Sequence, residues 1–202
     1  FRVDICSSKD TQGRIRDVVG FFEKAPQVLI NCAGPNFTPG QGEGGLGLFE
    51  DHSEEDLNST LNIHLKGPFL TCQGFLKVYQ EHKIHLPDLT GSIINISSIY
   101  GVGAPPQDMY ECFRDGENNY YKPVSYSMVK AGIIGFTKGL AEYCGHRNLG
   151  VRVNTLVLGG VFTGQDPRFV RDYSRRTMIG RMAYTEDFNK AMLFLASDDS
   201  SY

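Results

Sequence analysis

Apolar residues along the chain occur in two alternating arrangements, which predict strands and helices in turn. Short apolar runs at residues 27–31, 91–98 and 151–160 have the length of strands. The second run is apolar nearly throughout, as in a parallel strand that is buried on both faces. Residues 1–5 look like the end of a further strand. We therefore expect a sheet of parallel strands.

Four segments carry apolar residues at helical spacing: residues 8–23, 54–80, 126–144 and a last helix opened by Thr185. Ser53 is placed to cap the second of these helices, which we expect to bend at Pro68, and Gly145 is placed to end the third. The expected core faces are formed by Ile15, Val18, Val19 and Phe22, by Leu57, Leu61 and Leu65, by Val129, Ile133, Phe136 and Leu140, and by Ala191, Leu193 and Leu195.

Strands and helices alternate without an internal repeat or a linker, so we expect residues 1–202 to form a single domain. This alternation predicts an α/β fold, a doubly wound parallel sheet with right-handed crossovers and helices on both faces, giving three αβα layers. Ligands of such sheets bind beyond the carboxyl ends of the strands. Here those ends are residues 31–34, Ser98 and Gly159.

Composition narrows the function classes. The 202 residues carry a net charge of −3, which favours neither a nucleic acid nor an acidic membrane surface as partner. No apolar run approaches the roughly 18 residues of a membrane span. The five cysteines are scattered and lack C-x-x-C spacing, which is typical of reduced thiols in a cytoplasmic protein. His82 and His85 lack further metal ligands nearby, so we expect no metal site.

The two ends suggest a fragment. The chain starts at Phe1, without a methionine and within the expected first strand, and it stops at Tyr202 just after the last helix. Near the start, residues 40–45 match G-x-G-x-x-G literally. They follow a proline-broken loop and do not lead directly from a strand into a helix, so we interpret them as a plain loop.

Candidate chemistry centres on Tyr126 and Lys130. Residues four apart share one face of a helix, so the phenol and the ammonium can point into the same space. A neighbouring cation favours the phenolate and lowers the tyrosine pKa, which makes the phenol a usable acid or base. An isolated Tyr-x-x-x-Lys is a weak signal, and its weight depends on the surrounding motifs.

Taken in order, the motifs resemble the short-chain dehydrogenase/reductase family, in its single-domain branch. The matching residues are Asp4-Ile5, Asn31-Cys-Ala33-Gly34, Ser98, the pair Tyr126 and Lys130, and Gly159-Gly-Val161-Phe-Thr163. The resemblance covers nearly the whole chain. It implies a Rossmann-like sheet that lacks the family's first β-α-β unit and last strand.

The resemblance also implies an NAD(P)-dependent oxidoreductase that interconverts a secondary alcohol and a carbonyl. Tyr126 is then the general acid/base, Ser98 orients the reacting oxygen, and Lys130 holds the nicotinamide ribose and lowers the pKa of Tyr126. The residues implied to bind NAD or NADP are Asp4, Ile5, Asn31, Ala33, Gly34, Tyr126, Lys130, Gly159, Val161 and Thr163. The choice between the two cofactors stays open, because the strand that determines it is missing.

The chain departs from the family pattern at several places. It lacks the glycine fingerprint that binds pyrophosphate. His64 stands where the family has a catalytic asparagine; it either relays protons or fills the place as a neutral ring. Leu158 replaces a usual proline. Tyr126 follows Ser98 by 28 positions, far more than in the common pattern, so residues 104–122 are an insertion that we expect to act as a lid or specificity element.

Several alternatives remain open from the sequence. The polar and aromatic insertion suits a sugar-like substrate or a generic one, and with His64 it is similar to a subgroup linked to surface-sugar and sialic-acid-like biosynthesis. A non-catalytic binding or regulatory protein, and a nucleotide-sugar epimerase or dehydratase, are the other function classes. The resemblance implies a homodimer or homotetramer, with Ile134 and Phe136 as candidates for the shared face.

Overall fold

A three-stranded parallel sheet lies at the centre of the molecule. In a computed structural model of the chain, residues 1–34, 47–114 and 119–201 are described. Strands β1 (Val28–Asn31), β2 (Gly91–Ser98) and β3 (Val151–Leu158) pair in the order β1-β2-β3. These strands confirm the three apolar runs as parallel strands, and the glycines of residues 40–45 lie outside the described residues.

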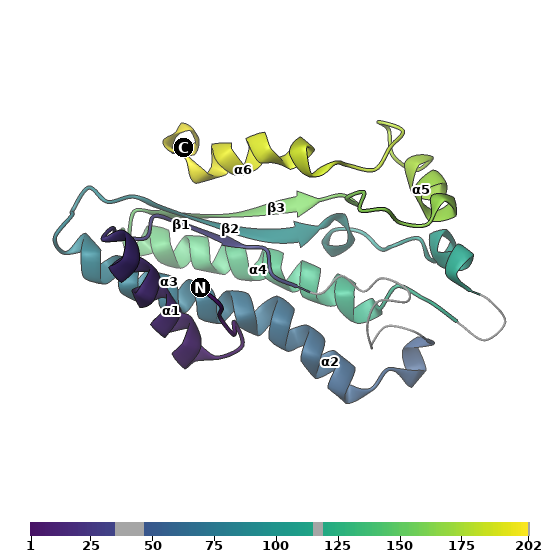
Figure 1. The fold of residues 1–202 in the computed structure, drawn as a ribbon, viewed down its shortest axis with the longest axis horizontal. Helices are drawn as coiled ribbons and strands as arrows, with labels where there is room; N and C mark the ends of the chain where they lie inside the picture. The colour runs from purple at the N-terminus through teal and green to yellow at the C-terminus, as the bar shows by residue number, and fades with distance from the viewer. Residues whose placement is uncertain (35–46, 115–118, 202) are drawn as a thin grey trace.

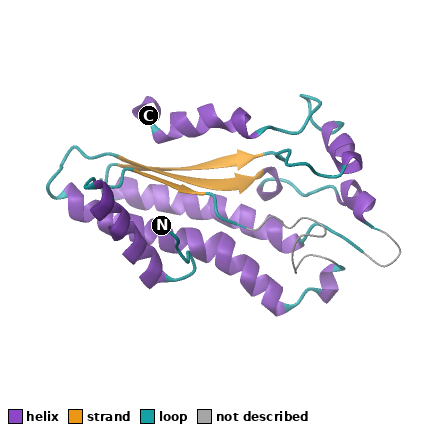
Figure 2. Cartoon of the chain, viewed as in Figure 1, coloured by secondary structure: helices purple, strands orange, loops and turns teal. Residues whose placement is uncertain are grey.

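Helices cover both faces of the sheet. Helices α1 (Ser8–Phe22), α3 (Gly67–Lys83) and α4 (Val124–His146) lie on one side, and α6 (Asn189–Ala196) lies on the other (Figure 1). Figure 2 shows the strands between the two helical layers. This arrangement confirms the expected three-layer α/β fold. The single helix α6 has no fully buried residue, and Leu193, expected on its core face, is 69% exposed.

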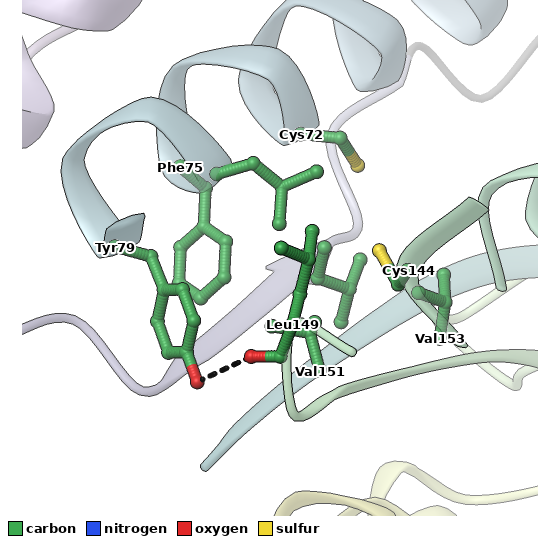
Figure 3. Packing of buried hydrophobic residues seen from close by; sticks show 9 residues of the cluster. Cys72, Phe75, Tyr79, Cys144, Leu149, Val151 and Val153 are labelled. Atoms are coloured by element: carbon green, nitrogen blue, oxygen red, sulfur yellow. Dashed lines mark hydrogen bonds between the residues drawn. The ribbon is translucent and has the colours of Figure 1, made fainter. Parts of the chain in front are cut away.

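The main core fills the space between the sheet and helices α3 and α4. Its buried members are Cys72, Phe75, Leu76 and Tyr79 of α3, Ile93 of β2, Cys144 of α4, and Leu149, Val151 and Val153 (Figure 3). The hydroxyl of Tyr79 lies 2.6 Å from the Leu89 carbonyl oxygen and 3.2 Å from that of Leu149. The buried phenol is therefore satisfied, as a polar group in an apolar core must be.

The helix expected over residues 54–80 is divided. Ser53 caps α2 (Glu54–Leu61) by accepting a hydrogen bond from the Asp56 amide, as predicted. A π-helical stretch, Asn62–Lys66, then joins α2 to α3, which has Pro68 in its first turn. Thr60 and His64 are buried, whereas Leu57 is 37% exposed, so the core face predicted for Leu57 was wrong. Leu61 and Leu65 are half-buried, and a Cβ on Gly132 of α4 would lie 3.0 Å from the Leu65 Cδ2, so Leu65 packs against α4.

Two further expectations need correction. Residues 1–5 form no strand; they make a turn, in which the Asp4 carboxylate accepts from the Cys6 amide at 2.9 Å, before α1 begins. A strand requires a hydrogen-bonded neighbour, and these residues pair with none of the described strands. Helix α5 (Pro167–Ser174) was not predicted. Its signal was present, because Asp166 caps it and Pro167 occupies its first turn.

Candidate functional site

A cavity of about 340 Å³ opens beyond the carboxyl ends of β2 and β3. This is where ligands bind in open parallel sheets. The predicted site residues that line it are Gly34, His64, Ser98, Tyr126, Lys130, Gly159, Val161 and Thr163. The tertiary structure therefore brings most of the expected set to one place.

Ser98 and Tyr126 meet inside this cavity. Ser98 is the last residue of β2 and is 9% exposed, and its hydroxyl accepts a hydrogen bond from the Tyr100 amide at 3.2 Å. Burial raises the pKa of Tyr126, and a hydrogen bond with Ser98 partly offsets this by lowering it. The phenol is therefore protonated at neutral pH in this structure. The expected net lowering of the Tyr126 pKa is not observed.

Lys130 lies close to Tyr126 but does not bond its oxygen in this structure. Its ammonium is 5.6 Å from the centroid of the Tyr126 ring and 3.3 Å from the Ile96 carbonyl oxygen, to which it donates. Burial lowers the pKa of Lys130, and the neighbouring Cys32 opposes that shift. Because the cation is over the ring and away from the phenolic oxygen, burial dominates the Tyr126 pKa.

The backbone of α4 is fixed at Lys130 by the end of β2. The Ser97 hydroxyl donates to the Lys130 carbonyl oxygen at 2.7 Å. Gly101, in the turn that follows β2, allows a close approach, since a Cβ there would lie only 2.5 Å from the same oxygen. Ser97 is thus a positioning residue for the helix that carries Tyr126 and Lys130.

His64 is buried beside the tyrosine. Its ring centroid lies 6.1 Å from that of Tyr126, edge to face, and only 5% of the residue is exposed. Burial, then Lys130 and Lys122, lower the pKa of His64 to about 4. The ring is therefore neutral at physiological pH. A Cβ at Gly34 would lie 2.5 Å from the His64 Cε1, so only glycine leaves room for this ring.

Tyr173 of α5 packs against the glycine turn that follows β3. The Gly160 amide donates to the Tyr173 hydroxyl at 2.5 Å, and a Cβ on Gly160 would lie 2.8 Å from the Tyr173 ring. Gln165 holds the next residues, donating to the Val161 carbonyl at 2.8 Å and accepting from the Thr163 amide at 2.8 Å. Tyr173 was not recognised from the sequence because α5 was not.

Four residues expected to bind cofactor do not line the cavity: Asp4, Ile5, Asn31 and Ala33. Asp4 lies in the turn before α1. The Asn31 side chain donates to Asn95 at 2.8 Å and accepts from Thr71 at 2.6 Å, which ties β1 to β2 and α3. Polar groups inside a sheet are satisfied by such bonds, so the structure gives Asn31 a structural role here.

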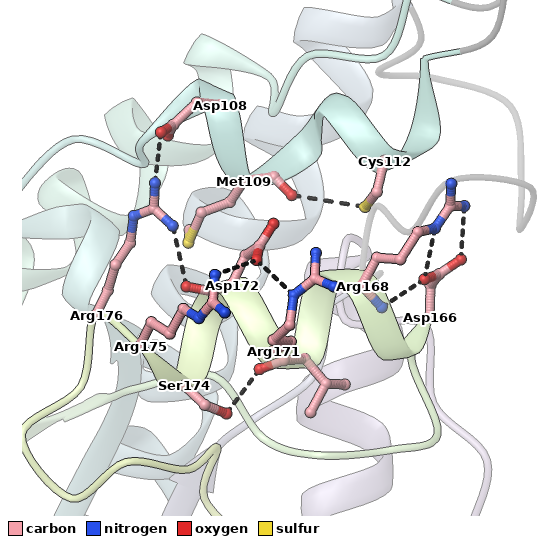
Figure 4. Close-up of polar contacts among 11 residues, drawn as sticks. Asp108, Met109, Cys112, Asp166, Arg168, Arg171, Asp172, Ser174, Arg175 and Arg176 are labelled. Atoms are coloured by element: carbon pink, nitrogen blue, oxygen red, sulfur yellow. Dashed lines mark hydrogen bonds and ion pairs between the residues drawn. The ribbon is translucent and has the colours of Figure 1, made fainter.

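The insertion forms one wall of the cavity. Its 3₁₀ helix, Gln107–Phe113, packs against α5 and buries an aromatic cluster made of Met109, Tyr110, Tyr120, Phe169, Tyr173 and Met182. The outer side of α5 carries several ion pairs, such as the one between Arg168 and Asp166 at 2.9 Å (Figure 4). A further ion pair, between Arg176 and Asp108, connects the residues after α5 to the insertion. The described part of the insertion is thus a packed wall of the cavity, and its role as a lid or specificity element stays a prediction.

A second lysine, Lys122, faces the tyrosine from the end of the insertion. Its ammonium lies 4.4 Å from the centroid of the Tyr126 ring, and the residue is 6% exposed. Burial and then Lys130 lower the pKa of Lys122 to about 8. Sequence reasoning did not single it out, although it precedes Tyr126 by the same four positions that separate Tyr126 from Lys130.

Within residues 1–34, 47–114 and 119–201, no three histidine, cysteine, aspartate or glutamate side chains are grouped as metal ligands would be. None of the helices in that part of the chain is long and apolar enough to cross a membrane.

Comparison with known proteins identifies the family. A family model described as enoyl-(acyl carrier protein) reductase matches residues 1–202. The chain is 32% identical over 203 residues to post-translational flagellin modification protein A of Campylobacter coli, covering all of this chain and 72% of that protein. It is 30% identical over 207 residues to human (3R)-3-hydroxyacyl-CoA dehydrogenase, covering all of this chain and 67% of that protein. A Chlamydia trachomatis 3-oxoacyl-[acyl-carrier-protein] reductase matches at 32% over 154 residues, which are 74% of this chain and 53% of that protein.

Solved structures of short-chain dehydrogenases are similar to the chain in sequence and in fold. A short-chain dehydrogenase from Leptospira borgpetersenii with bound NAD⁺ is 33% identical, with a TM-score of 0.81 over all of this chain and 69% of that one. ElxO with bound NADP shares the fold at a TM-score of 0.76 and 23% identity, over all of this chain and 72% of that one. Since one family model spans residues 1–202 and a solved short-chain dehydrogenase superposes on all of them, the chain belongs to the short-chain dehydrogenase/reductase family of NAD(P)-dependent oxidoreductases.

Proposed function

We propose that the protein to which this chain belongs interconverts a secondary alcohol and a carbonyl by hydride transfer, with Tyr126 as general acid/base. The observation that carries the proposal is that Tyr126 and Ser98 line the same cavity and that Ser98 acts on the Tyr126 phenol, lowering its pKa against the effect of burial. A substrate oxygen placed between these two hydroxyl groups meets a proton donor and a hydrogen-bonding partner at once.

The residues on one side of the cavity fit a nicotinamide cofactor, NAD or NADP. Gly34, Lys130, Gly159, Val161 and Thr163 would hold it. The close approach of Gly160 to Tyr173, which a Cβ would prevent, keeps the backbone of this turn compact. When bound, the nicotinamide ring would supply or accept the hydride. The chain's own contribution is position and proton transfer.

Proton transfer follows from the protonation state of the site. Burial keeps the pKa of Tyr126 raised, so the phenol holds its proton at neutral pH and can donate it to a carbonyl oxygen during reduction. In oxidation Tyr126 must first pass its own proton on, and the phenolate then takes the hydroxyl proton of the alcohol. Ser98 orients the reacting oxygen in both directions.

His64 is proposed as a relay between Tyr126 and solvent. The neutral ring has one donor and one acceptor nitrogen, so it can pass a proton without net charge, and burial holds it in that state. His64→Asn keeps substantial turnover if the position serves as a relay that an amide can also fill. A large loss would indicate a role that only histidine performs.

Substrate, assembly and location are further parts of the proposal. The substrate is a small alcohol or carbonyl compound, and the flagellin-modification relative favours a sugar-like one. A homodimer or homotetramer is proposed through α4 and its neighbour α3, because Phe69 is 51% exposed and packs 5.8 Å from Phe136. The scattered cysteines favour a cytoplasmic location.

The test is a fluorescence titration with NADH and NADPH. It is carried out on this 202-residue chain and on the protein translated from the whole reading frame that encodes it. Binding by the full protein, with turnover of a secondary alcohol, supports the proposal and identifies the preferred cofactor. A folded full-length protein that binds neither dinucleotide would instead favour the alternative of a non-catalytic binding or regulatory protein.

A further inference from the structure

The Tyr173 hydroxyl is a buried hydrogen-bond donor whose proton the described part of the chain does not use. Its oxygen accepts a hydrogen bond from the Gly160 amide at 2.5 Å. Within residues 1–34, 47–114 and 119–201, no oxygen or nitrogen atom accepts the Tyr173 proton in return. The residue is only 6% exposed. Buried donors in proteins normally have an acceptor, so this proton requires one from outside the described chain.

Tyr79 shows how a buried phenol is satisfied where no ligand is involved. It is fully buried in the main core, and its hydroxyl donates to the Leu89 carbonyl oxygen at 2.6 Å. Tyr173 instead lies in the lining of the cavity, together with Gly159 and Gly160. The contrast indicates that a molecule in the cavity supplies the acceptor for the Tyr173 proton.

The Tyr173 hydroxyl is held in one position. Its ring packs within the aromatic cluster, with its centroid 6.0 Å from that of Phe169. On the other side, a Cβ on Gly160 would lie 2.8 Å from the ring, and a Cβ on Gly159 would lie 3.4 Å from the hydroxyl oxygen. The oxygen is therefore fixed and only its hydrogen can rotate, which lowers the entropic cost of binding an acceptor there.

This donor lies near the proposed reaction centre. Ser98 pairs with Leu158 in the sheet, and Gly160 follows Leu158 by two residues. Helix α5 carries Tyr173 to the same end of the sheet (Figure 1). Neighbouring parallel strands lie about 4.8 Å apart. A molecule whose reacting oxygen lies at Ser98 thus needs to extend by only a carbon or two for a second oxygen to reach Tyr173.

We propose that Tyr173 is a specificity residue that donates a hydrogen bond to a second oxygen of the substrate, so that the enzyme acts on hydroxy ketones and polyols such as sugars. This inference rests on the proposed function, since it places the reacting oxygen at Ser98 and Tyr126. A site built to donate to an oxygen discriminates strongly against the analogue that lacks it, because the buried donor is then left without an acceptor. A plain ketone should therefore be a poor substrate.

The experiment compares substrates with and without the second oxygen, using the protein translated from the whole reading frame. The probes are 3-hydroxybutan-2-one, 4-hydroxybutan-2-one and butan-2-one, with the preferred dinucleotide. We expect the wild type to prefer at least one hydroxy ketone. Tyr173→Phe should reduce kcat/KM for that substrate by about tenfold while butan-2-one changes little, because one hydrogen bond to the substrate is lost. Tyr184→Phe, at a position that is 52% exposed and outside the cavity lining, is the matched control.

Binding measurements separate this inference from the proposed function. NMR titration with butane-2,3-diol, butane-1,3-diol and butan-2-ol requires no turnover. Diol binding that Tyr173→Phe weakens, with butan-2-ol unaffected, supports the subsite even in a protein that fails to transfer hydride. An equal loss for diol and mono-alcohol, which a tyrosine that only holds the Gly160 turn would give, overturns the proposal. So does a loss confined to dinucleotide affinity, or a wild-type protein that does not prefer the diol.

Discussion

The two lysines that flank Tyr126 are held by different kinds of structure. Lys130 is one turn along α4, and its carbonyl is fixed by Ser97 at the end of β2. Lys122 lies before the helix, and its backbone is fixed by Gln107 of the insertion. The first arrangement is made by a strand and a helix packed together, and the second by a loop folded onto itself.

This difference separates two tasks. The strand and helix side carries Ser98, Tyr126 and Lys130, proposed for the acid/base chemistry, and the residues proposed to hold the dinucleotide, which every substrate needs. The insertion and α5 build the opposite wall from aromatic side chains and Lys122. Changes on the first side should therefore affect all turnover, and changes on the second should affect the choice of substrate.

The largest effect is expected where the two sides meet. Tyr126→Phe removes the proton donor but keeps the ring between the lysines, so turnover should fall by about a thousandfold. Dinucleotide affinity, measured by fluorescence titration, should change little. Tyr143→Phe, at an exposed position on the same helix, is the control. Substantial residual turnover in Tyr126→Phe would refute the acid/base assignment.

The protonation of His64 depends on burial first and then on both lysines, Lys130 and Lys122, which together lower its pKa to about 4. Between about pH 4 and 6.5 the unfolded chain binds more protons at this position, so stability is complete above pH 6.5 and falls as the pH drops toward 4. The loss is at most about 3.4 kcal/mol. Urea denaturation at pH 7 and 4.5 measures it, and His64→Asn should remove this part of the pH dependence. Lys122→Met should weaken it, since one repelling charge is gone.

Gly101→Ala tests only the strand and helix side of the cavity. The new Cβ would lie 2.5 Å from the Lys130 carbonyl oxygen and 2.6 Å from its carbon, and backbone atoms cannot rotate away. We expect a loss of about 1–3 kcal/mol in the free energy of unfolding and reduced turnover of all substrates. Gly139→Ala is the control, because no atom lies within 4 Å of its added Cβ, and in a helix it should stabilise by about 0.5–1 kcal/mol. Equal results for both variants would show that the contact is not tight.

Gln107→Ala tests only the insertion side of the cavity, and its expected effect on stability and turnover is the smallest. It removes two hydrogen bonds to the Lys122 backbone and should cost about 1–2 kcal/mol of stability. Turnover should fall modestly, while NADH affinity is unchanged. Gln80→Ala, which removes a side-chain bond within α3, is the control and should leave turnover unchanged. Unchanged stability and turnover in Gln107→Ala would mean that Lys122 is positioned by other contacts.

Much of the strand and helix side of the cavity could be predicted from the sequence. The three strands, the Ser53 cap and the helix that carries Tyr126 and Lys130 each depend on residues within one segment. Local spacing decides such features, because side-chain direction follows the helical or strand period. The cavity at the carboxyl ends of the strands followed from topology alone.

Other features depended on partners far along the chain. Leu57 was expected on the core face of α2 but is 37% exposed. The contacts of the Asn31 side chain with Thr71 and Asn95 can be seen only after β1, β2 and α3 have packed, and the assignment of Asn31 to the cofactor stays a prediction. The pKa of Tyr126 depends on burial, which a helix in isolation does not have.

The sequence by itself determined the α/β alternation and the Ser98, Tyr126 and Lys130 set, because each strand and helix is encoded by its own residues. Only the tertiary structure decided the cavity wall built from the insertion and α5. Tyr173 reaches Gly160 from α5, and Gln107 reaches Lys122 across fifteen positions of an irregular segment. Side chains of loops follow no period, so their meeting points emerge only when the backbone has folded around the cavity.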